Sequence, residues 1–287
     1  MNKKMNRRSF LKKALGSLFT VTGAGLGGKY YINKIEPGWL EINHLSFSSK
    51  AVPKGFDGVK IVQFSDTHLG FQFQLQDLKE IIHVINSLDP DLIMFTGDLM
   101  DKPDQYTGYD EIIPVMKECK ARLGKFCIFG NHDHGGYGSE LYSRIMSKSG
   151  FILLRNSNRK IQLLGGDEIY ISGLDEPMLG SPDIDKALQG IPRNHLAVML
   201  SHAPDTAVTT SKYDVQLQLS GHSHGGQVQI PFFGALVTPP YSEIYREGTY
   251  DVGELKLHVN RGLGTTRLPY RFLSRPELTV IRLQSES

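Results

Sequence analysis

The chain has 287 residues, of which 32 are basic and 30 acidic, and its formal net charge is +2 at pH 7. Residues 1–28 hold six of the basic residues and no acidic one, so the rest of the chain has 26 basic and 30 acidic residues, a net charge of −4. This remainder lacks the basic stripe of a nucleic-acid-binding protein, and nucleic acid is not an expected partner. The two cysteines exclude a disulfide framework, and the length predicts one large domain after the first 28 residues.

The first 28 residues have the composition of an export signal. Residues 1–13 carry the six basic residues, and residues 14–28 are uncharged and rich in Gly, Leu and small side chains. The paired Arg7 and Arg8, followed by Ser-Phe-Leu-Lys, are typical of a twin-arginine signal, which brings folded proteins to the twin-arginine translocation machinery. The sequence therefore predicts a protein of the cell wall, the periplasm or the outer face of the cytoplasmic membrane.

The uncharged stretch leaves open how this signal ends. It is shorter than the ~20 residues of a comfortable membrane span, and Gly dilutes it. No convincing Ala-x-Ala cleavage site follows, although Thr22-Gly23-Ala24 is tolerable. Cleavage and retention as an anchor remain alternatives, and either places the protein near a membrane. Residues 29–58 are predicted to be a linker and entry segment, and residues 59–287 the main domain.

Short apolar runs and helical patterns alternate along the first half of the chain, and the second half is richer in strands. The apolar runs predict strands at 59–65, 92–96, 126–129, 196–200 and 215–219, because each is rich in β-branched or large apolar residues and ends near Gly, Asp or Ser. Apolar residues at helical spacing predict helices at about 76–88, 109–123, 140–148 and 183–189. These patterns predict a mixed α/β fold.

A polar motif follows each of the five predicted strands. The motifs are Asp66-Thr67-His68, Gly97-Asp98, Gly130-Asn131-His132-Asp133, Ser201-His202 and Gly221-His222-Ser223-His224. Loops at the carboxyl ends of strands converge on ligand sites in layered α/β folds. Since side chains two apart in an extended chain share a face, we expect Asp66 beside His68 and His222 beside His224. One motif alone is usually a turn, but five at equivalent places predict a shared site.

In this order the motifs resemble those of the calcineurin-like metallophosphoesterases, over residues 59 to 283. The resemblance implies two packed β-sheets flanked by helices, and a metallophosphoesterase domain over residues 59–287. It also implies two divalent metal ions with Asp98 bridging them. The remaining ligands would be Asp66, His68 and His224 for the first ion, and Asn131, His202 and His222 for the second. His132 would be the catalytic histidine that faces the ester, with Asp133 as its orienting partner.

These residue types suit hydrolysis of a phosphoric ester. Two ions ~3.5–4 Å apart can clamp the attacking and leaving oxygens, and a metal-bound water with a pKa of ~7 supplies hydroxide at neutral pH. A histidine in the place of His132 can then give a proton to the leaving oxygen. The mixed oxygen and imidazole ligands leave Mn, Fe and Zn open. The predicted enzyme is a metal-dependent phosphodiesterase.

The later segments bear on the substrate. Residues 231–241 and 260–264 resemble the exported bacterial phosphodiesterase branch, the YkuE/YaeI-like group, and this implies an envelope phosphodiester in a lipid or wall polymer. A pyrophosphate hydrolase of a lipid-linked UDP-sugar, of the UDP-2,3-diacylglucosamine type, is an alternative, and a non-catalytic binding scaffold is another. Phe232 and Phe233 either line an acyl groove or belong to a strand pair that completes the second sheet. Arg261 either pairs with phosphate or forms a structural salt bridge, and Asp175 has no assigned role.

Overall fold

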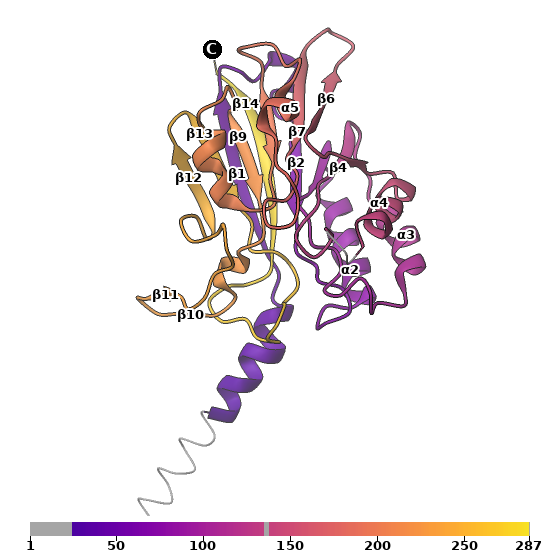
Figure 1. The fold of residues 1–287 in the computed structure, drawn as a ribbon, viewed down its shortest axis with the longest axis vertical. Coiled ribbons are helices and arrows are strands. Elements are labelled where there is room, and N and C mark those ends of the chain that lie inside the picture. The colour runs from indigo at the N-terminus through magenta and orange to yellow at the C-terminus, as the bar shows by residue number, and fades with distance from the viewer. Residues whose placement is uncertain (1–24, 135–137, 287) are drawn as a thin grey trace, which may run out of the picture.

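The computed structural model describes residues 25–134 and 138–286. The twin-arginine motif predicted at Arg7 and Arg8 lies outside the described residues. The fold is the predicted mixed α/β arrangement, with two six-stranded sheets packed face to face and helices on their outer faces (Figure 1). Within the part of the chain that the structure describes, no helix is both long and apolar enough to cross a bilayer.

The first sheet holds the three strands that precede the first three motifs. Its order is β1 (Glu41–Ser49), β14 (Glu277–Ser285), β2 (Lys60–Phe64), β3 (Leu92–Phe95), β4 (Gly124–Cys127) and β5 (Ile152–Leu153). From β2 to β5 the neighbouring strands run parallel, and β14 runs antiparallel to β2 but parallel to β1. Parallel strands buried on both faces need continuous apolar sequence, as β3 with Leu-Ile-Met-Phe has.

The second sheet carries the last two motifs. Its order is β12 (Gly248–Val252), β13 (Leu255–Val259), β9 (Leu217–Ser220), β8 (Ala197–Leu200), β7 (Glu168–Gly173) and β6 (Ser157–Gln162). The four inner strands are parallel, and the two edge strands are antiparallel to their neighbours. A separate hairpin pairs β10 (Gln229–Ile230) with β11 (Gly234–Ala235). The hairpin belongs to neither sheet, so the alternative in which this strand pair completes the second sheet is wrong.

Helices cover the outer faces of the two sheets. The α-helices are α2 (Leu75–Ser87), α3 (Tyr109–Lys117), α4 (Ser139–Lys148), α5 (Ile184–Leu188) and α6 (Ala207–Thr210). Short 3-10 turns are η2 (Glu36–Gly38), η3 (Lys54–Phe56), η5 (Pro204–Thr206) and η6 (His224–Gly226), and η1 (Tyr31–Ile35) is a π-helix that continues the helical residues 25–30. One apolar core joins α2, α3 and α4 to the first sheet, and a second fills the space between the sheets.

The alternation of β2 shows how the layers form. Val62 and Phe64 pack in the core under the helices, whereas Ile61 packs between the sheets with residues such as Val198. A period of two therefore supplies both cores from one strand.

The structure corrects the length of α3, which was predicted to reach residue 123 and ends at Lys117. The side chain of Asn86 binds the Glu118 carbonyl and the Lys120 N–H, which takes these groups out of a continuing helix.

Residues 29–58 are part of the folded domain and not a linker, because they contain β1. All nine residues of β1 pair with β14. The helical residues 25–35 project beyond the sheets, at the end of the molecule where the β10–β11 hairpin also lies (Figure 1). The helix is fixed by hydrogen bonds from Arg271 N to Ile32 O at 2.8 Å and from Asn33 Nδ2 to Pro269 O at 2.7 Å.

Candidate metal centre

The five motif loops meet where the carboxyl ends of the parallel strands in the two sheets lie side by side. Within the first sheet, Asp66 N donates to Gly97 O at 2.9 Å. Within the second, Gly221 N donates to His202 O at 3.0 Å. Buried Gln63 joins the sheets through a bond from its Nε2 to Ser220 O at 2.9 Å. The polar ends of β2, β3, β4, β8 and β9 are thereby held together.

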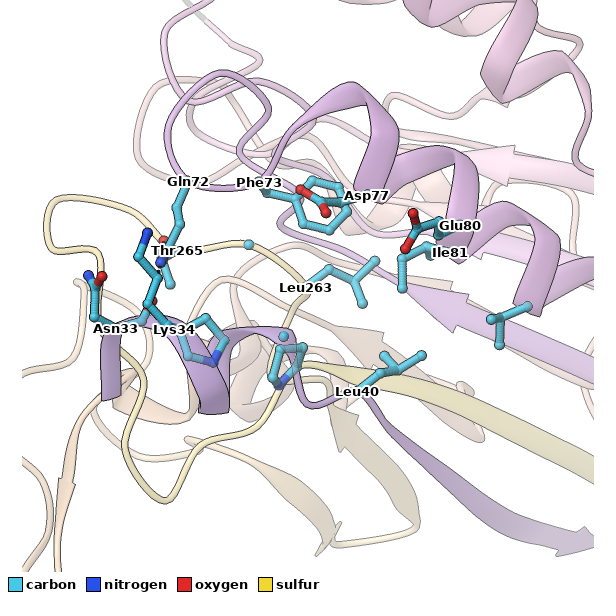
Figure 2. A pocket seen from close by; sticks show the side chains of 15 residues that line it. Asn33, Lys34, Leu40, Gln72, Phe73, Asp77, Glu80, Ile81, Leu263 and Thr265 are labelled. Atoms are coloured by element: carbon cyan, nitrogen blue, oxygen red, sulfur yellow. Dashed lines mark hydrogen bonds between the residues drawn. The ribbon is translucent and has the colours of Figure 1, made fainter. Parts of the chain in front are cut away.

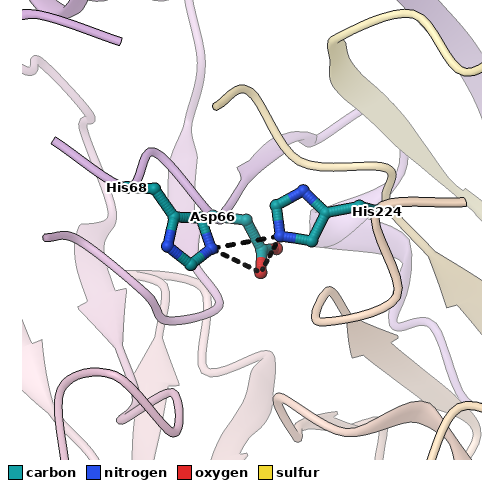
Figure 3. A group of neighbouring side chains, drawn as sticks. All are labelled: Asp66, His68 and His224. Carbon is teal, nitrogen blue, oxygen red and sulfur yellow. Dashed lines mark hydrogen bonds and ion pairs between the residues drawn. The ribbon is translucent and has the colours of Figure 1, made fainter. Parts of the chain in front are cut away.

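Asp66, His68 and His224 form the first group of potential ligands, and all three are buried. Figure 3 shows the side chains of Asp66 and His68, from the loop after β2, converging with that of His224, from the loop after β9. His68 Nε2 lies 3.1 Å from His224 Nε2, and Asp66 Oδ1 lies 3.5 Å from His224 Nε2 and 4.0 Å from His68 Nε2. The three atoms can therefore face one cation.

Asp98, His202 and His222 form the second group. His202 Nε2 lies 3.3 Å from Asp98 Oδ2 and 3.2 Å from His222 Nδ1. The amide oxygen of Asn131 lies 3.3 Å from the same His202 nitrogen. Asp98 Oδ2 is also 3.6 Å from His68 Nε2 in the first group. Asp98 is thus the carboxylate that lies between the two groups.

The backbone that aims these side chains is not extended, contrary to the alternation argument. Five of the residues have positive φ: Asp66 (50°), His68 (43°), Asp98 (60°), His222 (69°) and His224 (51°). Non-Gly residues rarely adopt this conformation, and such strain gathers at functional sites. The expected closeness of Asp66 and His68 is present, but it arises from left-handed turns. His222 and His224 in fact point into different groups.

Two glycines allow the close approach of the loops. Gly97 has φ +101°, and a Cβ there would stand 2.5 Å from Gly130 N and 2.8 Å from His202 Nδ1. A Cβ at Gly130 would collide with the Asp98 carboxylate. Glycine at both places lets the ends of β3 and β4 touch, which brings Asn131 toward Asp98.

The donor set fits divalent metal ions. Each group offers carboxylate oxygen and imidazole nitrogen, and its ligand atoms lie within 4.8 Å of one another. Such oxygen and nitrogen sets suit Mn, Fe and Zn. Outer partners fix the histidines: His202 Nδ1 lies 2.7 Å from Thr96 O, and His222 Nε2 lies 2.9 Å from Pro240 O. Hydrogen bonds of this kind set which ring nitrogen is free to bind a metal.

Three of the candidate ligands, Asp98, His222 and His224, have pKa values shifted toward the form that binds a metal. Burial acts to raise the pKa of the Asp98 carboxyl, but His202, His132 and His68 together hold it well below its ordinary value. Burial and the neighbouring His202 lower the pKa of His222 to about 3. Burial, with His68 and Arg271 nearby, also holds the pKa of His224 well below its usual range. Asp98 is therefore ionised and the last two histidines are neutral, which are the forms that bind metal. His202 differs, because burial acts to lower its pKa but Asp98 outweighs burial and raises the pKa to about 10, so that a metal ion would have to displace its proton.

His132 lies beside both groups at the wall of a cavity. Its Nδ1 is 2.6 Å from Asp101 O, so this nitrogen carries the proton of that hydrogen bond and Nε2 is left for another partner. Burial acts to lower the pKa of His132, but Asp98 and the Asp101 carbonyl outweigh it and raise the pKa. His132 is therefore placed as a proton donor, and its raised pKa favours the protonated form.

Asp133 does not orient His132, which corrects the prediction. Its carboxylate accepts the backbone N–H groups of Asp98 at 2.6 Å, Leu99 at 2.9 Å and Gly130 at 3.0 Å. A buried carboxylate in a turn takes the nearest unpaired N–H donors, and here these belong to the loops after β3 and β4. Asp133 therefore shapes the backbone that carries Asp98.

The sequence reasoning missed Asp101. Besides its carbonyl contact with His132, its carboxylate lies 3.3 Å from His68 Nδ1 and accepts a hydrogen bond from Thr266 Oγ1 at 2.7 Å. Asp101 thus orients the His68 ring without being one of the potential ligands of the first group. Its position three residues after Asp98 in the same loop is the signal that could have identified it.

A cavity of about 530 Å³ opens onto the two groups. His68, Asp98, Asn131, His132, His222 and His224 lie on its floor and walls. Much of the remaining lining is apolar. Val228, Leu236 and Val237 come from the β10–β11 region and the loop after it, and Leu268 and Tyr270 come from the loop between β13 and β14. The polar centre thus lies in a pocket with an apolar rim.

A second cavity, of about 380 Å³, lies away from these groups. Figure 2 shows it between α2, with Asp77 and Glu80, and the segment of Asn33 and Lys34. Its lining contains none of the residues of the two groups. This cavity is therefore separate from the candidate metal centre.

The structure also places the residues whose roles were open. Arg261 forms ion pairs with Glu277 at 2.8 Å and Glu41 at 3.0 Å, which favours its structural alternative. Asp175 is buried and pairs with His134 at 2.8 Å and Arg155 at 3.0 Å. These contacts hold the loop after β7 and do not enter the two groups.

A two-sheet α/β domain with adjoining Asp and His groups at the strand ends defines a metallohydrolase. A family model described as calcineurin-like phosphoesterase matches residues 59–226. The chain belongs to this family, and it is a metallophosphoesterase.

Three relatives cover nearly the whole chain. The chain is 48% identical to the uncharacterized metallophosphoesterase YkuE of Bacillus subtilis, over 99% of each chain. It is 27% identical to the phosphodiesterase YaeI of Escherichia coli, over 97% of this chain and 99% of the relative. It is 29% identical to the UDP-2,3-diacylglucosamine pyrophosphatase LpxG of Chlamydia trachomatis, over 93% of this chain and 96% of the relative.

Proposed function

We propose that the protein is a phosphodiesterase with two divalent metal ions, which acts on a phosphodiester of the cell envelope. The observation that carries the proposal is the sharing of Asp98 between two groups of buried ligands. In this proposal Asp66, His68 and His224 hold one ion. Asn131, His202 and His222 hold the other, and Asp98 holds both.

The metal pair supplies a hydroxide nucleophile and neutralises the phosphoryl oxygens when it is bound. The rest of the chemistry belongs to the side chains of the pocket. His132, protonated and held through Nδ1 by the Asp101 carbonyl, presents Nε2 to the leaving oxygen and gives it a proton. Asp101 and the carbonyls of Thr96 and Pro240 keep the histidine rings in position.

The pocket favours a diester over a monoester. Among its lining residues Arg267 is the one cation with a permanent charge, and a dianionic monoester gains most from several such groups. The apolar rim suits a substrate with an apolar or uncharged substituent beside the phosphate, as a lipid or a wall polymer offers. The name of YaeI as a phosphodiesterase agrees with this choice.

The test is metal analysis together with hydrolysis of chromogenic esters by the purified chain. We expect two metals per chain, loss of activity with chelator and recovery with Mn, Fe or Zn. We expect bis-p-nitrophenyl phosphate to be cleaved faster than p-nitrophenyl phosphate. Asp98→Asn should lower both metal content and turnover. One metal per chain, or a normal rate in this variant, contradicts the assignment of Asp98, and an inactive metal-loaded chain supports a binding scaffold.

A second candidate function is hydrolysis of the pyrophosphate in a lipid-linked UDP-sugar. It is favoured by the likeness to LpxG and by the apolar rim of a pocket of about 530 Å³. Release of UMP from UDP-2,3-diacylglucosamine separates this function from the first one. The proposed location is outside the cytoplasm, reached by the twin-arginine route.

A further inference from the structure

We propose that the β10–β11 hairpin, together with the helical segment 25–35, docks on a lipid bilayer and brings the mouth of the catalytic pocket to the membrane surface. The proposal begins at the turn of the hairpin. Phe232 is fully exposed and Phe233 is 84% exposed. Phe232 also has φ +71°, a conformation that bulky residues rarely adopt. Two exposed aromatic rings on a strained turn indicate an apolar partner.

The hairpin lies outside both sheets, so no packing inside the domain explains its aromatic tip. It is tied to the domain through its base. Val228 forms a bridge with Phe272, and Gln229 N donates to Phe272 O at 2.9 Å. Arg271, the residue before Phe272, donates its N–H to Ile32 O. The hairpin and the helical segment 25–35 are therefore held by one loop and project at the same end of the molecule (Figure 1).

The same end carries further apolar side chains and basic groups. Leu26 and Tyr30 are exposed on the helical residues 25–30, and Leu236 and Val237 are exposed at the pocket mouth. Lys29, Lys34, Arg246 and Arg267 are exposed as well. The Arg246 guanidinium lies within 4 Å of the Cβ position of Gly234 in the hairpin. Aromatic groups next to basic groups match the interface of an anionic bilayer.

The sequence that precedes this end favours a membrane over a protein partner. Residues 14–28 are uncharged and apolar, and residues 1–13 carry six basic residues. The chain enters the described structure at residue 25, at the hairpin end of the molecule (Figure 1). A segment of this composition and the hairpin would therefore contact the same membrane surface.

This geometry has a consequence for the substrate. The residues between hairpin and metal groups, including Leu236, Val237 and Leu268, line the pocket. A docked hairpin would place this apolar wall against the acyl region, so that a lipid phosphodiester reaches the centre without leaving the bilayer. This consequence rests on the proposed function, whereas docking itself does not.

The test compares two single-tryptophan proteins in the full chain. Trp39 is the one tryptophan, so Trp39→Phe gives a background without any. Phe233→Trp is added in one protein and Leu164→Trp in the other. Leu164 is fully exposed in the turn after β6, at the opposite end of the molecule (Figure 1). Any tether formed by residues 1–24 is the same in both proteins.

Each protein is mixed with vesicles of phosphatidylglycerol and phosphatidylcholine whose acyl chains are brominated. Bromine quenches a tryptophan that enters the acyl region. We expect strong quenching at position 233 and none at position 164. Equal quenching, or none at 233, overturns the proposal. A fall from dimer to monomer in Phe232→Ser/Phe233→Ser, without quenching at 233, assigns the hairpin to a second copy of the chain instead.

Activity supplies a second readout. Phe232 and Phe233 do not line the pocket, so Phe232→Ser/Phe233→Ser should cleave soluble bis-p-nitrophenyl phosphate at the wild-type rate. Its rate on hexadecyl p-nitrophenyl phosphate held in the vesicles should fall by about tenfold, since exposed aromatic area drives interfacial binding. Leu164→Ser is the matched control and should change neither rate. Equal rates on the vesicle substrate contradict the docking role. No cleavage of either ester by the wild-type chain contradicts the proposed function, and the quenching result still decides the docking.

Discussion

His132 and Asp133 are neighbours in one motif, yet the structure gives them different tasks. The His132 ring faces the pocket and is held by a backbone carbonyl, whereas the Asp133 carboxylate points back into the loops and collects three N–H groups. Substitutions should separate the two tasks, one changing the rate and the other the stability of the fold.

His132→Ala should reduce turnover by about 10²–10⁴-fold, because a general acid contributes on this scale. The loss should be smaller for an ester with a good leaving group, which needs no proton. Metal content should stay at the wild-type level, as measured by elemental analysis beside steady-state rates on several aryl esters. His83→Ala, on the exposed face of α2, is the control. Loss of one metal in the His132 variant would instead make His132 a ligand.

Asp133→Asn should lower the free energy of unfolding by about 2–3 kcal/mol, because an amide cannot accept three N–H groups and places its own N–H₂ against a donor. Urea unfolding of the purified chain measures this change. Asp104→Asn is a control at an exposed carboxylate in the loop after β3. An Asp133 variant with unchanged stability and a large loss in rate would assign Asp133 to the chemistry after all.

At the scale of elements, the strands and their motifs could be predicted, because each short apolar run ends within two residues of the end of its strand. The run at residues 92–96 became β3, Leu92–Phe95, and the run at 196–200 became β8, Ala197–Leu200. The β1–β14 pair could not be predicted, because no local pattern records which distant strand completes a sheet. The hydrogen bond of His132 to the Asp101 carbonyl could not be predicted either, because every residue has a backbone carbonyl and the sequence does not show which one a side chain will bind.

The end of β13 and the start of β14 are joined by a buried ionic group. Glu277 Oε1 lies 3.3 Å from His258 Nε2, and Glu277 Oε2 accepts from Arg261 Nε at 2.8 Å. Burial acts to raise the pKa of Glu277, but His258 and Arg261 outweigh it and lower the pKa to about 2. Since this lies below the ordinary 4.5, the carboxylate stabilises the fold fully above about pH 4.5 and loses this effect as the pH falls toward 2.

Glu277→Gln should therefore cost about 3 kcal/mol at most at pH 7, and the difference from wild type should shrink below pH 4.5. Chemical unfolding at a series of pH values measures it. Glu41→Gln is the matched control, since Glu41 pairs with the same Arg261 but is more exposed, and its loss should stay within about 1 kcal/mol. A Glu277 variant whose deficit is the same at pH 3 and pH 7 would contradict the lowered pKa.

At the scale of the whole molecule, the candidate ligands come from loops after β2, β3, β4, β8 and β9, which belong to both sheets. The centre therefore exists only once the two sheets have packed, and metal binding is tied to folding. A route that exports folded protein would let the cytoplasm choose the metal before transport, because competition outside follows affinity alone.

The paired arginines test this proposal. Arg7→Lys/Arg8→Lys keeps the charge of the signal, and we expect folded, metal-loaded and active enzyme to remain inside the cell. Fractionation with activity and metal assays measures the distribution. Lys3→Arg/Lys4→Arg is the control. It exchanges the same two residue types at positions other than 7 and 8, and this variant should be exported normally. Normal export of the Arg7/Arg8 variant would favour an ordinary secretory signal or a simple basic anchor.

The position of β14 between β1 and β2 sets an order of events during synthesis. β1 and β2 leave the ribosome early, but they do not pair with each other, and the strand that joins them is the last of the described strands to be made. Until then, the first sheet is divided and Asp66 lacks Gly262 and Gly264 beside it. Under the proposed twin-arginine route, the newly made chain would therefore present its signal long before it has a finished fold to transport, and export would have to wait during that interval.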